Sequence, residues 1–182
     1  MKNPCLISTV AVAAIAAGAH ADVTYTFDSL SLDAWEFSQI FGSGTLVGTL
    51  TGVSINATLL DSVRTYANDL TIYIDLPPTT GGLLQVGGYS TLGAAQRYFW
   101  TNGNSSEIGT VVSSTVTLAS AITFTGTAAD LPVLLGNGFS GAGASGTWSG
   151  SFTLIGVTEV PAPGAIALLG LAGLAAGRRR RA

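Results

Sequence analysis

The stretch from Asp22 to Val160 contains no cysteine, histidine, lysine or methionine. It therefore offers no disulfides, no thiol nucleophile and no soft metal ligands. A Ser-His-Asp triad is excluded too, because no imidazole is present to activate a serine. The chain's single cysteine, Cys5, and its single histidine, His20, both precede this stretch.

Positive charge is almost as scarce in the same stretch. Arg64 and Arg97 stand against ten acidic residues, so the net charge of residues 22–160 is -8. Such a surface repels phosphate backbones, and we expect no nucleic-acid partner. The 139 residues are enough for one domain whose core needs neither disulfides nor metals.

Residues 1–21 have the layout of a secretory signal peptide. Lys2 supplies a positive start, Leu6 to Ala17 form an apolar run, and Ala19-His20-Ala21 is a small-x-small cleavage site. We expect a signal helix that is removed, so that the exported protein begins at Asp22.

Residues 160–182 form a second sorting element. They read Val160-Pro161-Ala162-Pro163-Gly164, then an apolar run from Ala165 to Ala176, then the cluster Arg178, Arg179, Arg180 and Arg181. Twelve helical residues rise only about 18 Å against roughly 30 Å of hydrocarbon, so this short hydrophobic helix is a weak anchor. The arginines favour a cytoplasmic C-terminal end, which leaves the domain outside the membrane.

This order of proline motif, short span and arginine cluster resembles the PEP-CTERM sorting signal. The resemblance implies recognition and cleavage by an exosortase, a transpeptidase-like membrane enzyme of bacteria that often make exopolysaccharide. The implied partners are the secretion translocon, the exosortase, the inner membrane during transit, and exopolysaccharide. Ala162 stands where the family usually has glutamate, so the efficiency of cleavage is left open.

Between the two ends, apolar and polar residues alternate with the period of β-strands. Examples are Val23 to Phe27 and Leu70 to Leu76. Further strands are expected at Thr45 to Leu59 (two strands broken near Gly52), Leu83 to Val86, Gln96 to Thr101, Thr110 to Leu118, Ala121 to Thr127 and Thr147 to Val157. About nine short strands predict an all-β fold: one antiparallel β-sandwich or jelly-roll-like domain over residues 22–159, with an open barrel as the alternative.

Two segments near the end of the domain are expected to lie outside the main ladder. Leu131 to Leu135 contains Pro132 and is predicted to be an edge strand at most. Gly136 to Gly150 has six glycines and is predicted to be a loop.

Carboxylates are the remaining source of catalysis or metal binding. Asp33 with Glu36, or Asp61 with Asp69, are the pairs that a glycosidase would use, but acids near turns are usually solvated surface groups. Calcium would suit Asp28 and Asp33, yet no Asp-x-Asp-x-Asp loop occurs. We therefore predict a non-enzymatic domain without a cofactor.

Aromatic residues provide the candidate ligand site. Tyr98, Phe99 and Trp100 are consecutive, so alternation exposes Phe99 if its neighbours are buried, or the reverse. The leading hypothesis is an exported protein of the cell envelope or extracellular matrix. The alternatives are a carbohydrate-binding or adhesive module, marked by exposed rings at 98–100, and a glycosidase, which needs two facing carboxylates.

Overall fold

The computed structural model describes residues 22–76 and 81–161, which contain nine β-strands and one 3₁₀ turn. The strands are β1 (Val23–Asp33), β2 (Phe37–Phe41), β3 (Leu46–Val63), β4 (Leu70–Ile74), β5 (Leu84–Val86), β6 (Gln96–Tyr98), β7 (Val111–Thr125), β8 (Val133–Asn137) and β9 (Ser145–Glu159). The turn η1 (Ala67–Asp69) directly precedes β4. No α-helix occurs in the described residues, and the all-β prediction is confirmed. The expected helices of the signal and the tail fall outside these residues.

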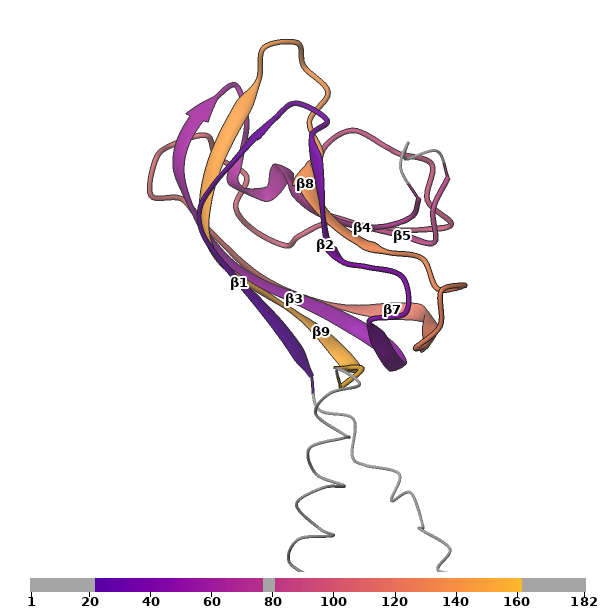
Figure 1. Cartoon of the computed structure of the whole chain (residues 1–182). Coiled ribbons are helices and arrows are strands. Elements are labelled where there is room, and N and C mark those ends of the chain that lie inside the picture. Colours follow the sequence, from indigo (N-terminus) through magenta and orange to yellow (C-terminus); the bar gives the residue numbers. More distant parts are fainter. Residues whose placement is uncertain (1–21, 77–80, 162–182) are drawn as a thin grey trace, which may run out of the picture.

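The strands form two sheets that lie face to face (Figure 1). The first sheet has the order β1-β9-β3-β7, and all its neighbours are antiparallel. The second has the order β2-β8-β4-β5-β6, and its short β5–β6 pair is parallel. The fold is thus a mainly antiparallel arrangement of two sheets, consistent with a β-sandwich.

The core lies between the sheets and follows the alternation read from the sequence. Along β7, for example, Val112, Val116 and Leu118 are buried while their neighbours at 111, 113, 115, 117 and 119 are exposed. Every residue of β4 and β8 is buried, because the outer face of these strands is covered as well. Tyr73 and Leu134 pack there against Leu92 in a second apolar cluster.

The predictions for the segment after Leu131 were wrong. β8 lies between β2 and β4 and is not an edge strand. Pro132 does not prevent this, because it precedes the first strand residue, Val133, and removes no donor from the ladder. The predicted loop from Gly136 to Gly150 shrinks to residues 138–144, since β8 continues to Asn137 and β9 begins at Ser145.

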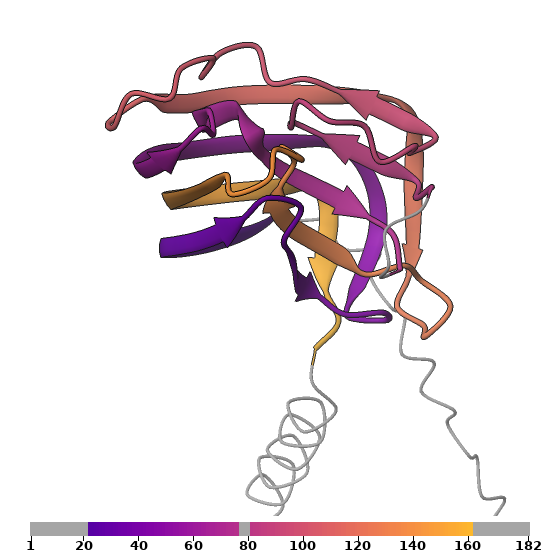
Figure 2. The ribbon, with the colours of Figure 1, turned by 90° about the horizontal axis from the view of Figure 1, so that it is seen from above.

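Two predicted strand breaks turn out to be bends within continuous strands. β3 shifts its register against β7 between Leu50 and Gly52, where a Cβ on Gly52 would approach the Val116 carbonyl oxygen to 2.7 Å. β7 bends sharply within its length (Figure 2), and its alternation is interrupted at residues 119–121. The residues that read as interruptions therefore mark curvature of the sheet. β2 was not predicted from the sequence.

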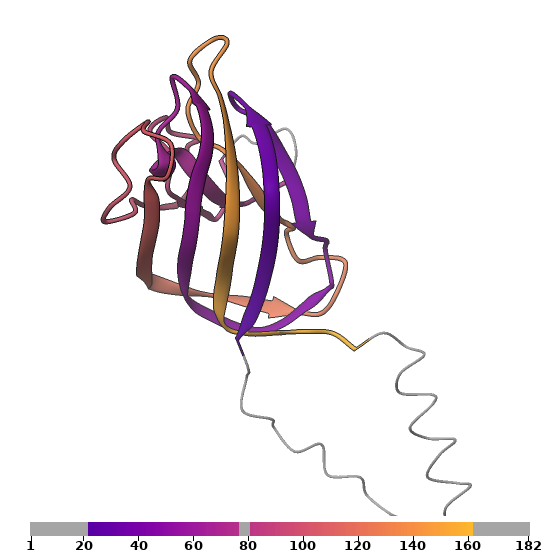
Figure 3. The ribbon, with the colours of Figure 1, turned by 90° about the vertical axis from the view of Figure 1, so that its left-hand side faces the viewer.

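The ends of the described chain meet at one end of the molecule. β1 and β9 are antiparallel neighbours, and Asp22 Oδ1 accepts a hydrogen bond of 2.9 Å from the Gly156 amide. Figure 3 shows β3, β9 and β1 side by side, running from this end to the opposite one. At the opposite end, Ser145 pairs with both Asp33 and Val63. The loops that leave those residues are gathered there, remote from Asp22 and Pro161.

Candidate functional site

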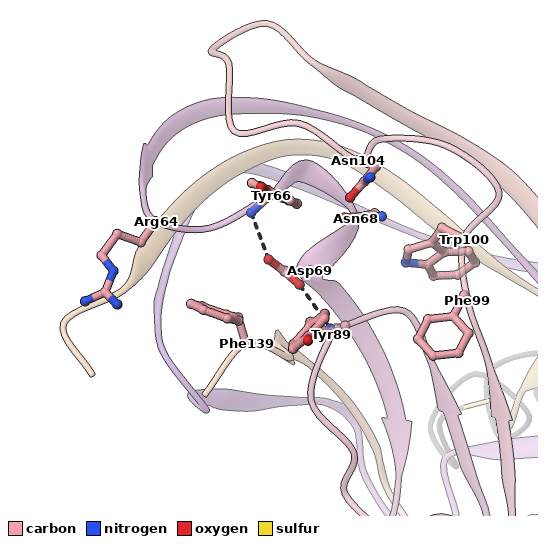
Figure 4. Close-up of a pocket in the computed structure, with 10 residues that line it drawn as sticks. Arg64, Tyr66, Asn68, Asp69, Tyr89, Phe99, Trp100, Asn104 and Phe139 are labelled. Carbon is pink, nitrogen blue, oxygen red and sulfur yellow. Dashed lines mark hydrogen bonds between the residues drawn. The ribbon is translucent and has the colours of Figure 1, made fainter. Parts of the chain in front are cut away.

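A pocket of about 660 Å³ opens among the loops at the end remote from Asp22 (Figure 4). Aromatic side chains supply most of its wall: Tyr66, Tyr89, Phe99, Trp100 and Phe139. Its polar lining comes from Arg64, Asn68, Asp69 and Asn104. A mainly aromatic hollow with a few polar groups is typical of small-molecule sites.

The three residues of the predicted platform have different environments. The Phe99 ring is 59 % exposed and lines the pocket, whereas Trp100 is 5 % exposed and donates its indole N–H to the Leu70 carbonyl at 2.7 Å. Tyr98 packs against the core, and its hydroxyl accepts a hydrogen bond from the Ala119 amide in the bend of β7. Phe99 is therefore the exposed member, and its aromatic neighbours in the pocket come from other loops.

Asp69 connects three of these loops. It is buried, and its carboxylate accepts backbone hydrogen bonds from Tyr66 (2.8 Å) and Tyr89 (3.0 Å). Its own carbonyl accepts a third from the Gly138 amide at 2.8 Å. One acidic residue thus positions the segments that carry Tyr66, Tyr89 and Phe139.

Burial raises the pKa of Asp69 above its ordinary value, although the hydrogen bonds from Tyr66 and Tyr89 lower it in part. The folded protein therefore binds this proton more tightly than the unfolded chain. The stabilisation from this difference is fully present below the unfolded pKa and is lost as pH rises through the folded pKa.

We expect Asp69→Asn to remove this pH dependence. The free energy of unfolding of the wild type minus that of the variant should fall as pH rises from below the ordinary aspartate value, about 3.9, through the higher pKa of the folded protein. Urea unfolding across that range measures it. Asp130→Asn is the matched control. The hydrogen bonds from Thr125, Thr127 and Gly126 outweigh desolvation and lower the pKa of Asp130. For this variant the free energy of unfolding of the wild type minus that of the variant should therefore rise with pH. Equal slopes for both variants would contradict the assignment.

The floor of the pocket is built from closely packed backbone. The Gly88 amide donates to the Asn68 carbonyl at 3.0 Å, and the Asn68 amide donates to the Gly103 carbonyl at 3.1 Å. Gly88 has a φ of 75°, and a Cβ there would lie 2.8 Å from Gly138 Cα. Glycine is required at this contact because any side chain would push the two loops apart.

Both cationic residues of the domain brace this pocket. Arg97 donates from Nη2 to the carbonyls of Tyr89 (2.8 Å) and Gly88 (3.3 Å), and its Cζ lies 4.5 Å from the Phe99 ring centroid. Arg64 donates from Nη1 to the Ala142 carbonyl at 3.2 Å. Arg97 thus ties β6 to residues 88–89, and Arg64 ties its own segment to the 138–144 loop.

Several polar groups of the pocket are available to a ligand. The side-chain amides of Asn68 and Asn104 and the hydroxyl of Tyr89 make no hydrogen bond to the described residues. In the view of Figure 4 the two asparagines are drawn close together, between Tyr66 and Trp100. Tyr89 is 77 % exposed and meets Phe139 edge to face at 6.2 Å between ring centroids.

Three of the acids considered for catalysis or calcium binding accept hydrogen bonds from the protein. Glu36 Oε2 accepts a hydrogen bond of 2.8 Å from the Asp33 amide, and Asp61 Oδ1 accepts one of 2.8 Å from the Ser62 amide. Asp28 Oδ1 accepts one of 2.7 Å from the Ser149 hydroxyl. Within residues 22–76 and 81–161, no group of three or more His, Cys, Asp or Glu side chains is placed to hold a metal ion.

The residues of the predicted signal-cleavage and sorting motifs lie only in part within the described chain. Asp22, Val160 and Pro161 are exposed, and the Val160 amide donates to the Thr45 carbonyl at 2.8 Å. The other motif residues fall outside the described ranges: Ala19, Ala21, Ala162, Pro163, Gly164, Arg178, Arg179, Arg180 and Arg181. No helix in the part that the structure describes is long and apolar enough to cross a membrane.

Sequence reasoning missed Tyr66, Tyr89 and Phe139. A local signal was present for two of them, because Tyr89 and Phe139 each follow a glycine in a segment without strand alternation. An aromatic residue in such a loop has no sheet face on which to pack, so it is a candidate for a binding surface. Comparisons of the chain with protein-family models, with curated proteins and with solved structures gave no match.

Proposed function

We propose that this chain is an exported, non-enzymatic protein of the cell envelope or extracellular matrix whose domain binds carbohydrate in the loop-end pocket. The observation that carries the proposal is the combination of exposed aromatic rings with unpaired amides in one hollow. Sugar rings have C–H groups on their faces, which pack on aromatic rings, and hydroxyl groups at their edges, which pair with amides.

The charge of the domain favours neutral carbohydrate. Residues 22–160 carry a net charge of -8, which disfavours polyanionic polymers. Asp69 is the one carboxylate among the described lining residues, and two backbone amides occupy it. A glycosidase would need a second carboxylate across the cleft, so this lining supports binding over hydrolysis.

The placement of the pocket suits an attached protein. Residues Asp22 and Pro161, which lead to the two sorting segments, lie at the opposite end of the molecule from the pocket. β9 alone has 15 residues, and at roughly 3.3 Å per residue it spans about 46 Å. If the tail resembles PEP-CTERM signals in function as well as in sequence, the pocket faces away from the membrane during processing.

We expect the exported protein to bind at least one neutral polysaccharide and to lose about tenfold in affinity when Tyr89 or Phe99 is replaced by alanine. Each ring is exposed, and the loss of one stacking contact is worth about 1.4 kcal/mol at that ratio. Isothermal titration against cellulose, laminarin, xylan and mannan fragments measures it.

Ile108→Ala is the matched control, since Ile108 is 70 % exposed but does not line the pocket. It should bind as the wild type does. The proposal is wrong if no neutral glycan binds, or if Ile108→Ala weakens binding as much as Phe99→Ala.

A further inference from the structure

A second hollow of about 340 Å³ adjoins the pocket. Its lining comes from Asp33, Ala34 and Trp35 and from the loop segment 140–144. Phe139 lines the first pocket, and the Cα atoms of Phe139 and Ser140 are about 3.8 Å apart as consecutive residues. Residues of one loop, 138–144, therefore line both hollows.

Trp35 differs from the other two tryptophans of the chain. Trp100 and Trp148 are buried, and each donates its indole N–H to a backbone carbonyl. Trp35 is 38 % exposed, and its indole N–H has no partner among the described residues. Trp35 is thus a partly exposed aromatic residue with an unpaired donor, and it lines the second hollow.

The backbone at Trp35 is also strained. Its φ is 61°, a region that bulky residues rarely occupy. Hydrogen bonds hold the turn in place: the Trp35 amide donates to the Asn137 carbonyl at 3.1 Å, and the Ala34 amide donates to the Ala144 carbonyl at 2.9 Å. Strain that the surroundings enforce at an exposed aromatic residue is typical of binding sites.

The loop between the hollows is fixed on both sides. The hydroxyls of Ser90 and Ser140 are hydrogen-bonded at 2.9 Å, which joins the loop to the segment that carries Tyr89. Arg64 Nη1 binds the Ala142 carbonyl further along the same loop. A ligand that contacts both hollows must therefore pass over a loop whose position is fixed by these hydrogen bonds.

We propose that Trp35 forms a second subsite for a neutral glycan chain, so that the domain recognises an extended polysaccharide and not a single sugar. The inference rests on the carbohydrate binding proposed for the first pocket. One end of the chain packs on the rings at 89 and 99, the middle crosses the 138–144 loop, and a later sugar unit packs on the Trp35 indole. Neutral glycans suit both hollows because neither has a cation free of backbone contacts and the domain is acidic.

The test is a titration of the protein with neutral oligosaccharides of increasing length. The full chain is expressed and the exported product is purified. The oligosaccharides run from disaccharide to octasaccharide and are prepared from cellulose, laminarin, xylan and mannan. For the wild type we expect affinity to rise with chain length and then to level off. Trp35→Ala should lower octasaccharide affinity about tenfold and leave disaccharide affinity unchanged. Phe99→Ala should weaken binding at every length.

Two further variants distinguish the contribution of the Trp35 ring to binding from that of its backbone conformation. Trp35→Phe keeps an aromatic face, so it should retain most of the increase in affinity with oligosaccharide length. Trp35→Gly suits the positive φ but removes the ring, so it should behave like Trp35→Ala. The thermal unfolding midpoint of each variant shows whether it is folded.

The outcomes distinguish the two proposals. Wild-type affinity without length dependence, or equal losses for disaccharide and octasaccharide in Trp35→Ala, would overturn the second subsite while leaving carbohydrate binding intact. If Trp35→Gly binds the octasaccharide as well as the wild type does, the ring plays no part. No binding at any length, or binding unchanged by Phe99→Ala, would overturn the function proposed for the first pocket and this inference with it.

Discussion

Trp148→Ala is expected to lower the free energy of unfolding by about 3–5 kcal/mol, the usual cost of truncating a buried tryptophan. The Trp148 side chain is 0 % exposed and lies on β9 opposite Leu30 of β1 and Leu59 of β3. Alanine would leave a large cavity in the core beneath the start of β9. It would also leave the Ala67 carbonyl without the indole N–H that now donates to it at 3.2 Å.

Urea unfolding of the purified protein measures this loss as a lower midpoint with an unchanged slope. Trp35→Ala is the matched control, since the same truncation at a partly exposed site creates no core cavity and should cost less than about 1 kcal/mol. Equal losses in the two variants would show that Trp148 is not a core residue. Because Ala67 begins η1, we also expect Trp148→Ala to loosen the segment that carries Tyr66.

Local sequence pattern was sufficient to place most strands. Val23 to Phe27 and Val111 to Leu118 alternate clearly, because one face of each strand meets the core and the other meets water. Pattern was insufficient for β8, whose residues are buried on both faces. Its apolar run does not alternate, and Pro132 at its start resembled an interruption. Only the pairing with β2 and β4 shows that the proline lies outside the ladder.

The breaks predicted near Gly52 and after Leu118 show a second limit. Both positions interrupt alternation, and a sequence does not distinguish a strand that ends from one that bends. Here the bend in β7 is supported by a distant strand: the Gln96 side chain donates to the Ser120 carbonyl at 2.8 Å and accepts from the Ser120 amide at 3.0 Å. The Gln96 side chain, 24 residues away, thus pairs with the backbone N–H and C=O of Ser120, which would otherwise lack partners at the bend.

The candidate site was predictable only in part, for a related reason. Alternation around Phe99 indicated that one ring of the triplet faces solvent, and the structure places Phe99 there. Its partners are far apart in the chain: Tyr66 precedes β4, Tyr89 follows β5 and Phe139 follows β8. They meet because these segments converge at one end of the sandwich, where Asp69 binds all three loops. In the sequence, nothing distinguishes Asp69 from the other acidic residues.

The tail is expected to be removed from the exported protein by a processing enzyme. From the sequence we expect Pro161 and Pro163 to disfavour helix and to leave an extended segment accessible. The apolar run that follows is short for a membrane span, and four arginines are expected to resist passage. The mature protein should therefore lack residues Arg178 to Arg181. Pro163→Leu should block cleavage, leave the full tail in place and retain the protein in the membrane.

Intact-mass measurement on protein from the native envelope tests this in the wild type, in Pro163→Leu and in a strain without the processing enzyme. Ala162→Glu restores the residue that PEP-CTERM signals usually have, so it should cleave at least as fast as the wild type. Ala162→Ser is the matched control, since it changes the same position without adding the carboxylate. Wild-type protein that retains all four arginines in both strains would show that the tail is a permanent anchor. Faster cleavage in Ala162→Glu alone would show that the processing enzyme reads a negative charge between the two prolines.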